Sequence, residues 1–324
     1  MKKKLVICFI LLTSLLSGLT AQELPLIRDK QGTFQILSRT DYVSEDCGYT
    51  KAEITAHLQR ITDLVTVVRQ NPVLRDLKGF EGRAKINNLD CKEVSGYGIP
   101  AGVSFEFASW FRNQDGAPAV TLIEPPVWHI CINQAKPGWG SSYSHDTKRG
   151  YFTAPLNKIT VEPGIDVYDG EWFIIYDPSR PPYWITVTVN EAFAAVRESM
   201  SKWEDDYGTR LQKEFVEKEY AEIPESERDN PAFFGGGISR VTHKPNTDGQ
   251  DNLHIVKVNP DYWNRTLPRS AIQILNFNSV QNKEYLRKLM EEYLEKESTS
   301  YNLKRFEVSF DMDEIRRLLP LIGN

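Results

Sequence analysis

Apolar residues recur at helical spacing directly after residue 50. The pattern consists of Ile54, Leu58, Ile61, Leu64 and Val68. Thr50 and Glu53 precede it with the spacing of a capping box, in which a hydroxyl and a carboxylate bind the first free N–H groups of a helix. We therefore predict an amphipathic helix of about five turns that begins just after residue 50.

A second helical pattern begins after another capping box, formed by Thr188 and Glu191. Its apolar positions are Phe193, Val196, Met200, Trp203, Tyr207, Leu211 and Phe215. The positions between them are rich in charged residues, which is typical of a helix with one face in water. We predict one long helix over about residues 189–220, with positions 193–207 in the core. The part beyond Gly208 is the better candidate for a partner surface.

Short apolar runs bounded by turn residues predict strands elsewhere in the chain. These runs are residues 33–37, 80–87, 99–112, 119–133, 159–161, 165–168, 171–176, 183–187, 233–243, 253–258, 271–277 and 306–310. Asp169-Gly170 separates two of them, and this dipeptide is typical of a tight hairpin. Two further helices are predicted over residues 282–294 and 312–319. The fold class that follows is α+β, with antiparallel sheets and packed helices.

Residues 136–150 are rich in Gly and Ser and lack apolar periodicity, which is typical of a linker or a long surface loop. We interpret this stretch as the connection between an N-terminal α+β unit, residues 22–135, and a C-terminal α+β unit, residues 151–324. Each predicted unit consists of a helix followed by a meander of strands. Asn-Pro follows each of the two helices, so an internal duplication is a further hypothesis.

The first 21 residues have the pattern of a secretory signal peptide. Three lysines precede an apolar run from Leu5 to Leu19, and Thr20-Ala21-Gln22 supplies a small residue for cleavage. The run is shorter than the roughly 20 residues that span a bilayer. We expect cleavage after Ala21, export to the periplasm or the extracellular space, and no transmembrane segment afterwards.

Composition and charge exclude several classes of protein. The 324 residues are 40% hydrophobic and 26% charged, which excludes collagen, low-complexity disorder and a polytopic membrane protein. Without residues 1–21 the chain has 36 basic and 44 acidic residues. Phosphate contacts need clustered Lys and Arg, so we expect no nucleic-acid partner. The partner that we expect is a protein or a saccharide in the cell envelope.

Export also changes the interpretation of the cysteines, because disulfides persist outside the cytoplasm. Beyond the signal peptide the chain has Cys47, Cys91 and Cys131, and a helix-plus-meander unit brings all three to one end. Cys131 lies in the apolar run 127–132, so we interpret it as a buried thiol and predict a Cys47–Cys91 disulfide. Cys91–Cys131 is the alternative. With His129 the three thiols match no zinc module, and we predict no metal and no cofactor.

The sequence has none of the common motifs of serine hydrolases, zinc proteases or P-loop enzymes. His145 and Asp146 lie in the Gly/Ser-rich loop beside several serines, and loops carry catalytic residues disproportionately. These two residues are therefore the catalytic candidates. Gly235-Gly-Gly237 resembles an anion cradle, but a strand-like run follows it instead of a helix. We interpret these glycines as a bulge or a close-packed strand.

Aromatic residues are concentrated between Trp128 and Trp184. Trp139, Tyr143 and Tyr151 lie in or beside the Gly/Ser-rich loop. Large amphipathic rings at such places serve as contact anchors for a sugar, a peptide or a protein, so these three are the binding candidates. The alternative is that the loop folds back and packs the rings onto the sheet.

Three segments carry a resemblance to known proteins. They are Thr20-Ala21-Gln22, residues 183–191 (Tyr-Trp-Ile-Thr-Val-Thr-Val-Asn-Glu) and residues 258–273, which include Asn-Pro-Asp-Tyr-Trp-Asn-Arg. They resemble exported proteins of Gram-negative bacteria that have no assigned activity. The resemblance implies export and transfers no catalytic residue. Together these observations favour a non-enzymatic binding or interaction protein of the envelope, with a periplasmic hydrolase that uses His145 and Asp146 as the alternative.

Overall fold

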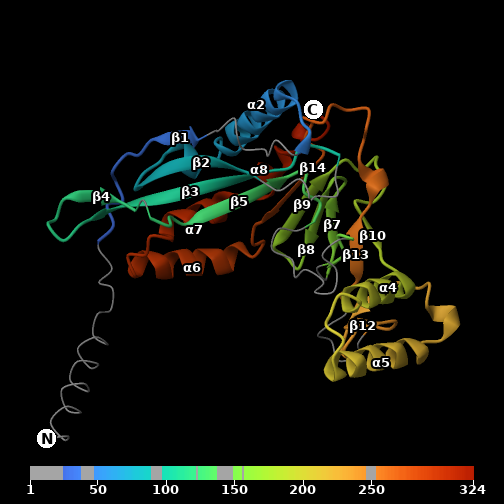
Figure 1. Cartoon of the computed structure of the whole chain (residues 1–324). Coiled ribbons are helices and arrows are strands. Elements are labelled where there is room, and N and C mark those ends of the chain that lie inside the picture. The colour runs from blue at the N-terminus through green and yellow to red at the C-terminus, as the bar shows by residue number, and fades with distance from the viewer. Residues whose placement is uncertain are drawn as a thin grey trace, which may run out of the picture.

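A computed structural model describes residues 25–37, 47–88, 97–121, 123–136, 149–154, 157–245 and 253–324. Its centre is a nine-stranded sheet (Figure 1). In sheet order the strands are β1 (Phe34–Leu37), β2 (Phe80–Asn88), β3 (Ala101–Arg112), β5 (Val127–Ile132), β14 (Ile274–Asn278), β9 (Trp172–Tyr176), β8 (Ile165–Tyr168) and β7 (Ile159–Glu162), and β4 (Pro118–Val120) pairs with β3. Only β1 and β2 run parallel within it. The predicted α+β class with antiparallel sheets is confirmed.

The strand β14 joins the two predicted units into this one sheet. It pairs with β5 on one side and with β9 on the other, so that Asn276 lies opposite both Cys131 and Ile174. The stretch 136–150 therefore does not separate two sheets, in contrast to the predicted division. The physical reason is that two half-sheets would each expose an unpaired edge, whereas β14 satisfies the backbone groups of both.

Four helices cover one face of the sheet: α2 (Lys51–Val68), α3 (Pro72–Arg75), α7 (Tyr301–Ser309) and α8 (Met312–Arg316). Alternate strand residues point toward this layer, as the two-residue period of a strand requires. At its centre the ring of Trp128 lies within 5.6 Å, centroid to centroid, of four aromatic rings: Phe105, Phe277, Phe306 and Phe310. The helix α6 (Lys283–Glu295) packs against α7 (Figure 1).

Two local sequence patterns, the first capping box and the Asp169-Gly170 turn, predicted their structures correctly. The hydroxyl of Thr50 accepts a hydrogen bond from Glu53 N, and the Glu53 carboxylate accepts one from Thr50 N, so α2 begins at the predicted capping box. Asp169 and Gly170 have φ angles of 50° and 74° and connect β8 to β9 as predicted. These left-handed conformations match the type I′ hairpin turn.

The predicted strand over residues 306–310 is wrong, because these residues belong to the end of α7 and its C-cap. Phe306, Val308 and Phe310 alternate in sequence as strand residues do, but Phe306 and Phe310 are also four residues apart. On a helix that spacing places both rings on one side, where both contact Trp128.

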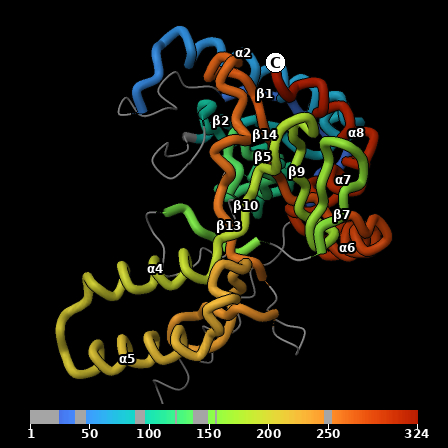
Figure 2. Tube along the Cα trace, turned by 90° about the vertical axis from the view of Figure 1, so that its right-hand side faces the viewer, coloured from blue at the N-terminus to red at the C-terminus, as the bar shows by residue number. Residues whose placement is uncertain are grey.

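Residues 189–221 form two helices instead of the single helix that was predicted. They are α4 (Val189–Met200), which begins at the capping box of Thr188 and Glu191, and α5 (Tyr207–Ala221). The two helices run antiparallel and project away from the main sheet (Figures 1 and 2). The Asp206 carboxylate accepts a hydrogen bond of 2.7 Å from Thr209 N, which caps a new helix and explains the break.

The break also moves part of the predicted apolar stripe out of the core. Phe193, Val196 and Met200 are buried against α5, as expected. Trp203 and Tyr207 are 38% and 75% exposed, so their predicted burial is wrong. Trp203 lies in the connection between α4 and α5, where it no longer follows the period of α4.

A second, three-stranded sheet covers part of the opposite face of the main sheet. Its strands, in the order β10-β13-β6, are β10 (Trp184–Thr186), β13 (Ile255–Val258) and β6 (Phe152–Thr153). An aromatic cluster fills the interface and includes Tyr168, Trp172, Tyr183, Trp184 and Trp263. Most of the described aromatic side chains between residues 128 and 184 are therefore buried.

One charged side chain is fully buried in this interface. The Asp166 carboxylate of β8 has no exposed area and accepts hydrogen bonds from four side chains. The donors and distances are Lys158 Nζ at 2.7 Å, Thr160 Oγ1 at 2.7 Å, Tyr183 OH at 2.5 Å and Tyr176 OH at 3.3 Å. Because Tyr183 immediately precedes β10, this carboxylate links the main sheet to the smaller one.

The three glycines 235–237 lie in the hairpin between β11 (Phe233–Phe234) and β12 (Val241–Thr242). Beside them, Ile238 N and Ser239 N donate hydrogen bonds of 2.8 and 3.0 Å to the two carboxylate oxygens of Glu219 on α5. The loop is thus an anion cradle that an internal carboxylate fills. The close packing predicted for the glycines holds at Gly235, where an added Cβ would lie 2.6 Å from Thr242 Cγ2. The strand predicted from residue 238 is wrong at its start, because Ile238 and Ser239 lie in the loop, where successive backbone N–H groups bind an anion without any helix behind them.

We expect Gly237→Ala to loosen this attachment of α5. The φ of Gly237 is +83°, and an added Cβ would lie 2.6 Å from Glu219 Oε1. The free energy of unfolding should fall by about 1–3 kcal/mol. Gly236→Ala is the matched control, since a Cβ there meets nothing within 4 Å. Urea denaturation that gave the same midpoint for both variants would contradict the assignment.

Candidate functional site

Most of the predicted loop residues lie outside the described residues: Trp139, Tyr143, His145 and Asp146. Tyr151 is described, and it is only 4% exposed. Its ring packs in the cluster beneath α4, with Lys257 Nζ 5.9 Å from the ring centroid. Tyr151 is therefore placed as a core residue, which matches the alternative interpretation for this ring.

The cysteines are only partly described. Cys47 is half-buried and packs against the main core, and Cys91 lies outside the described residues. Cys131 is a free thiol, and burial raises its pKa to about 11. Cys131 is only half-buried, short of the full burial that was predicted, but a thiol that stays neutral is a poor nucleophile. The Cys47–Cys91 pairing stays a prediction.

His129 contacts a serine on the neighbouring strand that no motif had indicated. Ser104 of β3 lies directly opposite His129 of β5, and Ser104 Oγ is 2.9 Å from His129 Nδ1. Asn87 Nδ2 donates a hydrogen bond to the same Oγ. Ser104 is only 4% exposed, so a substrate has no access to this hydroxyl. We interpret the pair as part of a buried polar network instead of a nucleophile and its base.

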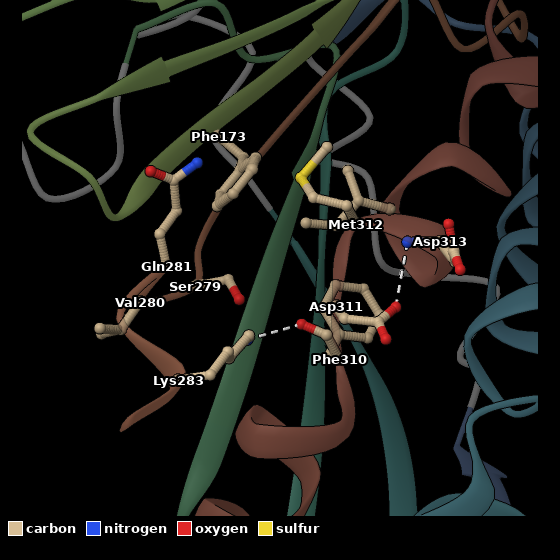
Figure 3. A pocket seen from close by; sticks show the side chains of 10 residues that line it. Phe173, Ser279, Val280, Gln281, Lys283, Phe310, Asp311, Met312 and Asp313 are labelled. Atoms are coloured by element: carbon tan, nitrogen blue, oxygen red, sulfur yellow. Dashed lines mark hydrogen bonds between the residues drawn. The ribbon is translucent and has the colours of Figure 1, made fainter. Parts of the chain in front are cut away.

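A cavity of about 440 Å³ opens where the helical layer meets the β8–β9 hairpin (Figure 3). Its floor is apolar and is formed by Phe173, Val280, Phe310, Met312 and Ile315. Its polar lining consists of Ser279, Gln281, Lys283, Asp311 and Asp313. A volume of this size, with an apolar floor and few polar groups, is typical of a site for a small molecule.

Three separate segments build this cavity. Phe173 comes from β9, residues 279–283 lead from β14 into α6, and residues 310–315 include the start of α8. Backbone hydrogen bonds from Ser279 N to Glu171 O and from Gln281 N to Gly170 O hold the second segment against the β8–β9 hairpin. The wall is therefore fixed by the fold.

Lys283 contributes the positively charged side chain of the cavity lining. Its Nζ donates hydrogen bonds of 2.7 and 2.8 Å to the carbonyl oxygens of Glu307 and Phe310, at the C-terminal end of α7. Figure 3 shows the bond to Phe310. An ammonium group has three N–H donors, so these two bonds leave one for another acceptor. Burial lowers the pKa of Lys283, while the nearby Asp311 opposes that effect.

The two carboxylates of the lining are already engaged. Asp311 Oδ1 caps α8 by accepting hydrogen bonds from Asp313 N and Glu314 N at 3.0 and 3.2 Å. The Asp313 carboxylate pairs with Arg316 at 2.7 Å. A ligand that enters the cavity therefore finds the ammonium of Lys283 as its main charged donor, beside the amide of Gln281.

Another cavity, of about 360 Å³, lies between α4 and α5. The charged heads at its edge bind each other: Arg197 donates hydrogen bonds of 2.7 and 2.8 Å to both oxygens of Glu217. This pairing leaves fewer groups for a ligand than the cavity at Lys283 offers.

The described ranges hold neither a metal-binding cluster nor a membrane-spanning helix. No group of three or more His, Cys, Asp or Glu side chains there is arranged to hold a metal ion. In the same part of the chain, none of the helices combines the length and the hydropathy needed to cross a bilayer.

The sequence offered no local signal for the cavity at Lys283, because its residues come from positions 173, 279–283 and 310–315. Only the position of β14 beside β9 brings them together. Comparison of the chain with protein-family models, with curated proteins and with solved structures finds no match.

Proposed function

We propose that this chain is an exported binding protein without catalytic activity, and that the cavity at Lys283 is its ligand site. The observation that carries the proposal is a preformed apolar cavity with one partly buried ammonium in its lining. Small-molecule sites typically combine an apolar body with a few fixed polar groups that orient the ligand.

The chemistry of the lining suggests the class of ligand. The rings of Phe173 and Phe310 and the side chains of Met312 and Ile315 suit an apolar or aromatic body. The third N–H of Lys283 suits a carboxylate, sulfonate or carbonyl oxygen. We therefore propose a small amphipathic molecule that carries an acidic or strongly polar oxygen.

The geometry favours binding over hydrolysis. Ser279 also lines the cavity, but no hydrogen bond joins its hydroxyl to Lys283, and Ser279 is 3% exposed. A nucleophile and its base must lie within about 3 Å of each other. The hydrolase alternative rests on His145 and Asp146, which lie outside the described residues.

The test uses the mature chain and 1-anilinonaphthalene-8-sulfonate, an aromatic anion that fluoresces when it leaves water. We expect one site, and we expect Lys283→Gln to raise its dissociation constant about tenfold or more, because a charge-assisted hydrogen bond is lost. Lys288→Gln is the matched control on the same helix, since its side chain is 73% exposed. Its binding should equal that of the wild type.

A second variant separates the cavity from unspecific surface binding. Met312→Trp fills the cavity and should abolish binding of the probe while the thermal midpoint stays close to that of the wild type. Equal binding by wild type, Lys283→Gln and Met312→Trp would reject the cavity as the ligand site.

A further inference from the structure

An apolar row lies on the exposed side of α5 and in the connection before it. It consists of Trp203, which lies before the helix, and of Tyr207, Leu211 and Phe215, whose four-residue spacing on α5 places them along one side. Their exposed fractions are 38%, 75%, 37% and 45%. Single exposed apolar residues are ordinary, whereas a continuous row of large ones marks an interaction site.

A charged row runs beside the apolar row. It consists of Asp206, Arg210, Glu214 and Lys218, again four residues apart and all exposed. The signs alternate along α5: negative, positive, negative, positive. Read in the opposite direction, the same row is positive, negative, positive, negative, so the row is complementary to an antiparallel copy of itself.

We propose that a second copy of this chain packs its α5 antiparallel against α5 of the first, about a two-fold axis near Leu211. Arg210 of each copy then lies opposite Glu214 of the other, and Asp206 lies opposite Lys218. The symmetry forms each of these ion pairs twice, as expected of an isologous contact. The charge pattern of α5 therefore favours a second copy of this chain as the occupant of this surface.

The charged pairs are centred on Gln212 and the apolar row on Leu211, one residue or about 1.5 Å apart along the helix, so nearly the same axis also aligns the apolar row. Tyr207 and Phe215 are equally far from Leu211 along the helix, so Tyr207 of one copy meets Phe215 of the other across the leucines. Aromatic residues are enriched at the centres of protein interfaces. Figure 2 shows α4 and α5 extending from the main sheet, so two arms can approach each other without a clash between the sheets.

A lipid surface is the weaker alternative for this side of α5. Glu204 and Asp205 extend the acidic charge at the start of the apolar row, and both are exposed. Helices that lie on anionic membranes instead carry Lys and Arg on their polar side.

The test is sedimentation equilibrium of the mature chain over a micromolar concentration range, with charge-reversal variants of the charged row. We expect a reversible dimer in the wild type. Arg210→Glu and Glu214→Arg, each alone, place two pairs of like charges across the axis and should weaken the dimer at least tenfold. The double variant restores opposite charges and should return the affinity to near that of the wild type.

Leu211→Asp should abolish the dimer, and Lys288→Glu, which reverses a charge on α6, should leave it unchanged. These positions are exposed, so the thermal midpoints of the monomers should agree. A wild type that stays monomeric would overturn the proposal, whether or not vesicles of anionic lipid then bind the chain. A dimer that survives Leu211→Asp would also overturn it, and so would a double variant that fails to restore affinity.

Discussion

Asp166→Ala should lower the free energy of unfolding by about 3–5 kcal/mol, since it removes a buried carboxylate with four donors. Tyr183 and Thr160 would lose an acceptor inside the interface between the two sheets. Lys158 is 46% exposed and can return to water, so its share of the loss is smaller than that of a fully buried partner. Urea denaturation at neutral pH gives the value directly.

Two further variants show which interactions account for the lost free energy of unfolding. Tyr183→Phe keeps the carboxylate and removes one hydroxyl, so it should cost about 1–2 kcal/mol. Asp63→Ala changes an exposed carboxylate on α2 and should stay within about 0.5 kcal/mol of the wild type. If Asp166→Ala behaved like Asp63→Ala, the link between the two sheets would not depend on this carboxylate.

The stability of the protein should fall as the pH is lowered from about 6.5 to 4, and His57 should account for about 3 kcal/mol of that loss. His57 lies on α2 with no exposed area, and its Nδ1 donates a hydrogen bond of 2.9 Å to the carbonyl oxygen of Ser270. Burial lowers its pKa to about 4, and Arg60 acts in the same direction.

The sign follows from the two protonation states. Between the folded pKa of about 4 and the usual value of 6.5, the unfolded chain binds a proton at His57 and the folded chain does not. Lowering the pH through this window therefore favours unfolding. The contribution is fully present above pH 6.5.

The comparison with His57→Gln isolates this residue, because glutamine keeps an N–H donor near Ser270 but does not titrate. His129 and His254, whose pKa values burial also lowers, are present in both proteins and cancel in the comparison. Urea denaturation from pH 4 to 7.5 should show the wild type losing its advantage as the pH falls. Two parallel curves would refute the assignment.

The parts of the fold that were predictable are those whose cause is local. Both capping boxes and the Asp169-Gly170 hairpin depend on a few neighbouring residues, and all three formed as predicted. The helix break near Asp206 is also local, but the apolar period continues from Met200 to Tyr207 and hides the cap.

The parts that were not predictable depend on pairing between distant segments. Ser104 meets His129 only because of the register between β3 and β5, and the cavity at Lys283 exists only because β14 lies beside β9. Apolar periodicity specifies which side of a strand is buried, but it does not identify the neighbour of that strand. The anion cradle of the β11–β12 hairpin also depends on another segment, since the carboxylate that it binds, Glu219, comes from α5.

The central place of β14 has a consequence for the order in which the molecule forms. This strand spans residues 274–278, yet it separates strands that end at residue 132 and begin at residue 172. The middle of the sheet therefore cannot close until most of the chain has been synthesised. Folding must wait for contacts of long sequence separation, which slows it, and the half-sheets formed meanwhile expose two complementary edges. A chain shortened before residue 274 would keep those edges open and would be prone to aggregate.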